Sequence, residues 1–180
     1  MVKEAGDHPL EPFVMRSPGA GDFRDPRLAA LLAHWQNLRA RVAPAGMPPS
    51  TMLDPTDLVF ILGWLMILEP IAGGQDFRYR LYGSKIASIT GRDYTGQKIS
   101  QSVPEFANWA AGVYRSILEE PQPVLTRHTS HRVVKMDQWE RLILPFAGAD
   151  GAVDRLLVGA IIMAKLKESS PVRLPFPRRE

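Results

Sequence analysis

Residues 76–83 read Asp-Phe-Arg-Tyr-Arg-Leu-Tyr-Gly, and from residue 77 aromatic or apolar side chains alternate with basic ones. Successive side chains of a β-strand point to opposite faces, so this alternation predicts a strand with Phe77, Tyr79 and Leu81 on one face. A pair of glycines at 73–74 supplies the turn before it.

Downstream, the apolar spacing changes to that of helices and then back to that of strands. A short helix is expected over 84–90, with Ile86 and Ile89 facing inward, and a longer one over 104–120. Turn signals at 135–137 and 148–151 separate three further strands, which we expect at 124–133, 139–146 and 153–164.

Upstream, two helix starts are marked by an aspartate that can cap the free N–H groups, followed by proline. Asp25-Pro26 opens a helix over 26–42, and Asp54-Pro55 opens a shorter one. The apolar run at 61–68 then predicts a buried strand.

Consecutive strands favour antiparallel pairing. We therefore expect an α+β domain, with a five-stranded antiparallel sheet, helices on one face and an amphipathic N-terminal helix. Its 180 residues suit a single domain. Residues 1–25 are expected to be a flexible arm, 26–166 the domain, and 167–180 a basic, proline-rich tail.

The net positive charge of the chain lies at its C-terminal end. The net charge is +3, yet the last sixteen residues hold five basic and two acidic side chains, which leaves seventeen of each sign in residues 1–164. A nucleic-acid-binding surface concentrates Lys and Arg on one face. The neutral body therefore favours no nucleic-acid partner, and the tail is either solvated or a contact for an acidic partner.

Two absences in the sequence narrow the function classes. The longest apolar run, at 58–68, has eleven residues, whereas a membrane-spanning helix needs about 20. The chain has no cysteine, which excludes disulfides and thiolate metal sites and fits a reducing compartment. We expect a cytoplasmic protein without a membrane anchor.

Several motifs in this order resemble one protein family. Residues 77–83 lead into Ser-Lys-Ile-Ala at 84–87 and Gly-Arg-Asp-Tyr-Thr-Gly at 91–96. Together with residues 52–58 and 139–145, they resemble small free-standing bacterial PAS proteins, over about residues 26–164. The motifs also have a local interpretation: Gly83 and Gly91 suit a positive φ or a helix stop, and Asp93 suits a turn.

The resemblance implies a fold, PAS-like, and a role. PAS domains are sensory or signalling modules that bind a small ligand or a partner protein in or around a cavity between sheet and helices, and they commonly pair through N-terminal helices. The resemblance implies no catalytic reaction. We therefore expect a bacterial homodimeric sensor that acts by protein–protein contact.

The resemblance also bears on cofactors. Haem-binding PAS domains carry a histidine on or beside the long helix, and residues 104–120 have none. A flavin–cysteinyl bond needs a cysteine, which is absent. Both cofactors are therefore disfavoured, and a noncovalent small molecule remains open.

Periodicity gives the candidate site residues. The ligand-pocket candidates are Tyr79, Ile86, Ile89, Trp109, Tyr114, Leu142, Leu144 and Ile161, for which plain core packing is the alternative. Arg141, on the opposite strand parity from Leu142, is expected at solvent or an interface. The dimer-interface candidates are Leu28, Leu31, Trp35, Leu38 and Val42, whose alternative is packing of their helix on its own sheet.

Three further interpretations stay open. His128 and His131, three apart on a strand, point to opposite faces, so a metal site would need a bulge. A small α+β enzyme would need an acid–base residue in an apolar cavity, and the available acids are Asp93, Glu105 and Glu140, none on a clearly buried stripe. A ligand-free dimerisation module is the third.

Overall fold

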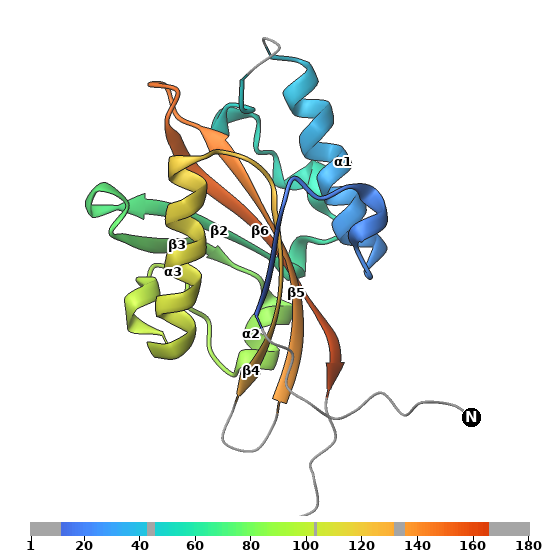
Figure 1. Cartoon of the computed structure of the whole chain (residues 1–180), viewed down its shortest axis with the longest axis vertical. Coiled ribbons are helices and arrows are strands. Elements are labelled where there is room, and N and C mark those ends of the chain that lie inside the picture. Colours follow the sequence, from blue (N-terminus) through green and yellow to red (C-terminus); the bar gives the residue numbers. More distant parts are fainter. Residues whose placement is uncertain (1–11, 43–45, 103, 132–135, 166–180) are drawn as a thin grey trace, which may run out of the picture.

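The structure is a computed structural model that describes residues 12–42, 46–102, 104–131 and 136–165. Its strands form one antiparallel six-stranded sheet in the order β1-β4-β5-β6-β2-β3, which is flanked by helices (Figure 1). The elements are β1 (Phe13–Arg16), α1 (Pro26–Ala40), β2 (Leu65–Ile71), β3 (Asp76–Tyr82), α2 (Ser84–Thr90), α3 (Pro104–Glu119), β4 (Val124–His131), β5 (Met136–Ala147) and β6 (Val153–Lys165).

The α+β class and the antiparallel sheet are confirmed, but the sheet has one strand more than expected. Residues 13–16 pair with β4 from Phe13 opposite Arg127 to Arg16 opposite Val124. The expectation of a flexible arm is therefore wrong for residues 12–25, whereas residues 1–11 and the tail 167–180 lie outside the described residues. Four residues are too few to show a period, and β1 is held through its backbone, which leaves no pattern in the sequence.

The helix starts follow their local signals. Asp25 accepts a hydrogen bond from the backbone N–H of Arg27 at 2.9 Å, with Pro26 in the first turn, and α1 ends at Ala40 rather than at residue 42. The helix α2 has the expected bounds and ends at Gly91, whose φ of 76° is left-handed. Not one helix in the described ranges combines the length and hydrophobicity that crossing a bilayer demands.

Gly83 is required for a different reason from the one expected. Its φ is −59°, so no left-handed backbone is involved. A Cβ at this position would collide with the backbone carbonyl of Gly63 and lie 2.8 Å from the carbonyl oxygen of Leu65. The 3-10 turn Leu62–Trp64 that precedes β2 thus packs directly on the start of α2. This turn also explains why β2 begins at Leu65 and not at residue 61.

The helices cover both faces of the sheet, as Figure 1 shows for α1 and α3. The side chains of β5 alternate: Ile143 belongs to the core under α3, whereas Leu142 and Leu144 belong to the core under α1. We call these sides the α3 face and the α1 face. The prediction of helices on one face holds for α2 and α3, and α1 forms a separate layer on the other.

Candidate functional site

Three polar side chains from β4 and β5 lie buried on the α3 face. Thr126 and His128 are two residues apart on β4, which places them on the same side of the strand, and Thr126 pairs with Arg141 of β5. The exposed fraction is 0% for Thr126, 6% for His128 and 2% for Arg141. Tyr114 of α3, also fully buried, contacts Arg141. We name Thr126, His128, Arg141 and Tyr114 the Arg141 cluster.

The guanidinium of Arg141 is the charged centre of this cluster. Its Nη2 donates a hydrogen bond to the Tyr114 hydroxyl, and its Cζ lies 5.3 Å from the centre of the Phe106 ring and 5.4 Å from that of the Tyr114 ring. Its Nε has no hydrogen-bond partner, and no carboxylate of the described residues forms an ion pair with it. A buried cation without a carboxylate is costly, so Arg141 is the least explained charge in the core.

His128 packs against two aromatic rings of α3. Its ring is 5.4 Å from Phe106 and 4.9 Å from Trp109. Burial, and second the positive charge of Arg141, lower the pKa of His128 to about 3, so the imidazole is neutral near pH 7. Its Nδ1 and the hydroxyl of Thr126 are, like Arg141 Nε, buried without a partner. Unpartnered buried polar atoms are rare, and three of them belong to this cluster.

The structure brings together only part of the predicted pocket. On the α3 face lie Tyr79, Ile86 and Tyr114, buried, with Ile89 and Trp109 partly buried against them. Leu142, Leu144 and Ile161 lie in the core of the α1 face. They are separated from the others by the sheet, because neighbouring positions of one strand point to opposite faces.

The dimer-interface candidates lie mainly against their own sheet. Leu28, Leu31, Trp35 and Leu38 are at most 4% exposed and share a core with β5 and β6. Trp35 donates from Nε1 to the carbonyl oxygen of Pro145 at 2.9 Å. Val42 lies beyond the end of α1 and is partly buried. The geometry thus favours the alternative of packing within one chain.

Strand parity predicts Arg141 at solvent or at an interface, and this prediction is wrong because the side chain is buried. Strand parity places Arg141 at solvent only if one face of β5 is exposed, but helices cover both faces. A signal existed in the sequence: Trp139 and Ile143, two positions either side of Arg141, are as apolar as Leu142 and Leu144. A strand that is apolar at both parities is buried on both faces, and a charge within it is then a candidate site.

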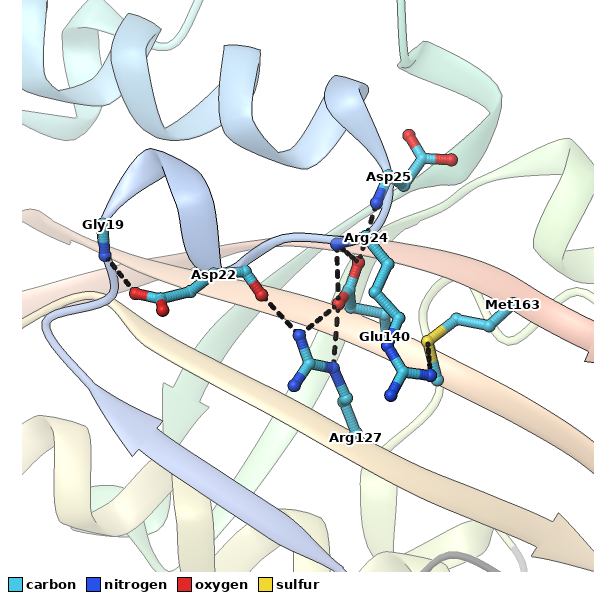
Figure 2. Close-up of polar contacts among 7 residues, drawn as sticks. All are labelled: Gly19, Asp22, Arg24, Asp25, Arg127, Glu140 and Met163. Atoms are coloured by element: carbon cyan, nitrogen blue, oxygen red, sulfur yellow. Dashed lines mark hydrogen bonds and ion pairs between the residues drawn. The ribbon is translucent and has the colours of Figure 1, made fainter. Parts of the chain in front are cut away.

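The α1 face of the same strands holds a second buried charge, shown in Figure 2. Glu140 is 0% exposed, and its carboxylate accepts from the backbone N–H groups of Arg24 and Asp25 at 3.1 Å and from Arg127 Nη2 at 2.8 Å. Arg127 also donates to the carbonyl oxygen of Asp22. We name Glu140, Arg127 and the backbone of residues 22–25 the Glu140 clamp, since they fasten the start of α1 to the sheet.

The structure places two of the three acids considered for an enzyme, Glu140 and Asp93. Glu140 is buried, contrary to expectation, but all its partners are supplied by the Glu140 clamp. Asp93 is exposed and accepts from the backbone N–H of Thr95 at 2.8 Å, the expected turn. The side chain of Glu105 lies outside the described part. Within the described ranges, no three His, Cys, Asp or Glu side chains gather as metal ligands; the side chain of His131 is not among those described.

A hollow lies on the α1 face, near the start of β2. It is lined only by apolar side chains, namely Leu53, Pro55, Leu58, Leu62, Leu65, Ile67 and Leu81. Ligand sites combine an apolar wall with a few polar groups that fix orientation. The Arg141 cluster has both kinds of group, so it is the better candidate site.

Comparison with known proteins gives one family and one solved structure of note. The profile of the family described as "PAS domain" matches residues 23–162. No curated protein sequence matches the chain. Among solved structures, one titled "Structure of an RNA-binding Light-Oxygen-Voltage Receptor" is similar, with 16% identity and a TM-score of 0.43 over 66% of this chain. The match spans 36% of that receptor's chain, so this chain corresponds to only part of its length.

Proposed function

The chain belongs to the PAS domain family, and we propose that it is a sensory module that binds a small molecule at the Arg141 cluster. The observation that carries the proposal is the presence of three unpartnered buried polar atoms in one cluster, Arg141 Nε, His128 Nδ1 and Thr126 Oγ1, where the His128 ring lies against aromatic rings of α3. Each such atom costs about 1–3 kcal/mol when unsatisfied, so a ligand that pairs with them would stabilise the fold.

A sensor must also transmit its state. We propose that the signal passes by contact with another protein, or with a second copy of this chain, when ligand binding changes how β4 and β5 hold the N-terminal segment. The support is positional: Thr126 and Arg141 face the site, whereas their neighbours Arg127 and Glu140 hold residues 22–25 on the opposite face. Pairing of two copies through the α1 stripe would require that helix to leave its sheet.

Native mass spectrometry of the purified full chain tests the binding step. We expect a small-molecule mass that is lost on denaturation or, for protein purified empty, a rise in Tm when the low-molecular-mass fraction of a cell extract is added. The variant Arg141→Gln should lose either response, and Arg78→Gln, at a partly exposed surface site, should keep it. A wild-type chain with neither response would contradict the proposal.

The transmission step has its own measurement. Hydrogen exchange of the backbone N–H groups of Arg24 and Asp25 should change when the site is filled, because these groups report on the Glu140 clamp. Exchange in η3 (Pro55–Leu58), which lies between α1 and β2 in the sequence and supplies no group of the clamp, serves as the internal control. Equal exchange with and without ligand at both places would contradict transmission through β5.

A further inference from the structure

We infer that the molecule bound at the Arg141 cluster is a small organic acid whose single carboxylate pairs with Arg141. The inference rests on the proposed binding function and adds the chemical class of the ligand.

Among the described residues, no carboxylate compensates the positive charge of the site. Arg141 is 2% exposed, and among the described residues its partners are a neutral hydroxyl, from Tyr114, and the faces of two aromatic rings. A buried charge without an opposite partner destabilises a fold strongly, because the cost of removing it from water is not offset. The contrast with Glu140, one residue away and fully paired, shows that this fold does compensate buried charge elsewhere.

The donors suit a carboxylate. The Nε–H of Arg141 has no partner, and with the neighbouring Nη it forms the flat two-donor edge that binds a carboxylate through both oxygens. The hydroxyl of Thr126, opposite Arg141 in the register, has no partner either and can donate to the same group. A carboxylate thus uses two of the three unpartnered atoms.

The charge count selects a monoanion. Burial and the charge of Arg141 keep the pKa of His128 at about 3, so His128 adds no positive charge at neutral pH. A single guanidinium balances a single negative charge, whereas a phosphate dianion would bring a second, uncompensated one into the core. The remaining unpartnered atom, His128 Nδ1, is then available to a neutral polar group of the ligand.

The body of the ligand is expected to be apolar and flat. Phe106 and Trp109 lie with their rings 6.2 Å apart against His128, and both are partly exposed, so they form the outer wall that must shift for entry. Aromatic walls favour stacking or edge contacts with a ring or a short apolar chain. The inferred class is therefore a monocarboxylic acid with an apolar or aromatic body.

Pairs of acid and amide probes test this inference on the full chain. Formate, benzoate and phenylacetate are titrated beside formamide, benzamide and phenylacetamide at constant ionic strength, with Tm and tryptophan fluorescence as readouts. We expect at least one acid to bind tenfold or more tightly than its amide. Arg141→Gln should abolish that preference, Thr126→Val should weaken the acid about fivefold, and Arg155→Gln, which faces Glu69 at the surface, should change nothing.

Each outcome decides the inference. Acid preference that depends on Arg141 and Thr126 supports it; if Arg141→Gln does not fold, the loss of affinity in Thr126→Val carries the test. Equal binding of acid and amide, no response to any acid, or an acid response that persists unchanged in Thr126→Val and Arg141→Gln overturns it. A neutral molecule found by native mass spectrometry would overturn the ligand class and leave the proposed binding function standing.

Discussion

Glu140 and Arg141 are neighbours on β5, both are at most 2% exposed, and their side chains lie on opposite faces of the sheet. The carboxylate of Glu140 is paired with Arg127 and two backbone N–H groups, whereas Arg141 has no carboxylate partner among the described residues. One strand therefore carries a structural clamp on one side and the candidate site on the other. Substitutions in the clamp and in the candidate site should therefore have opposite effects on stability.

Glu140→Gln should destabilise the fold by about 3 kcal/mol, because it leaves the largely buried Arg127 without its carboxylate and weakens two hydrogen bonds from the backbone. Urea unfolding measures the loss. Glu69→Gln is the control, since Glu69 meets Arg78, Arg80 and Arg155 only at 3.6–3.7 Å and these arginines are partly exposed; it should cost less than about 1 kcal/mol. Equal costs would contradict the role given to the Glu140 clamp.

Thr126→Val should stabilise the chain without ligand by about 1 kcal/mol, because the buried hydroxyl has no partner and valine has nearly the same shape. Stability and ligand affinity would then change in opposite directions at one position, as expected for a functional site.

Thr95→Val is the matched control for that variant. The Thr95 hydroxyl donates to Asp93 at 2.7 Å and accepts from the backbone N–H of Tyr82 at 3.1 Å, so its loss should cost about 1 kcal/mol. If both valine variants are destabilised alike in urea, Thr126 has a partner after all and the candidate site loses one of its groups.

Gly83→Ala should destabilise the fold by about 3 kcal/mol, because the added Cβ meets two backbone carbonyl groups, of Gly63 and Leu65, that cannot turn away. Gly112→Ala, on the exposed side of α3 with free space around it, should instead add about 0.5–1 kcal/mol. Thermal unfolding of both proteins compares them. A tolerated Gly83→Ala would mean that the packing of the turn before β2 on α2 is loose.

The elements that the sequence predicts well are those with local signals. The cap at Asp25 places the start of α1, and Gly91 places the end of α2, because each depends on a few adjacent residues. The start of β2 was misplaced because a continuous apolar run has no period to mark where a strand begins. The strand β1 was missed because its hydrogen bonds come from β4, more than 100 residues away.

The candidate site could be predicted only in part, for a related reason. Tyr79, Ile86 and Tyr114 follow from periodicity within their own elements. Arg141 and Thr126 become a pair only through the register of β4 with β5, which periodicity does not determine. Arg141 is buried because α1 covers one face of the sheet and α3 the other, and this tertiary packing does not follow from local sequence patterns.

His128→Phe should remove a pH dependence of stability. Folded His128 has a pKa of about 3, against about 6.5 in an unfolded chain, so between these values the unfolded state binds one more proton. The free energy of unfolding therefore falls as the pH drops below about 6.5, by up to about 1.4 kcal/mol per pH unit, and levels off near pH 3. From pH 7 to 4.5 the wild type should lose about 2.5 kcal/mol more than the variant.

Urea unfolding of both proteins at pH 7.0, 5.5 and 4.5 measures this difference. Hydrogen bonds from the Arg27 side chain and the Thr95 backbone lower the pKa values of Asp25 and Asp93. Protonation of these two carboxylates in acid therefore also lowers the stability of the fold, but by the same amount in both proteins. The variant keeps a ring against Phe106 and Trp109, so packing changes little. Parallel curves for the two proteins would show that His128 takes up a proton as readily in the folded state as in the unfolded one. Below about pH 6.5 the site would then carry two positive charges and suit a dianion instead of a monocarboxylate.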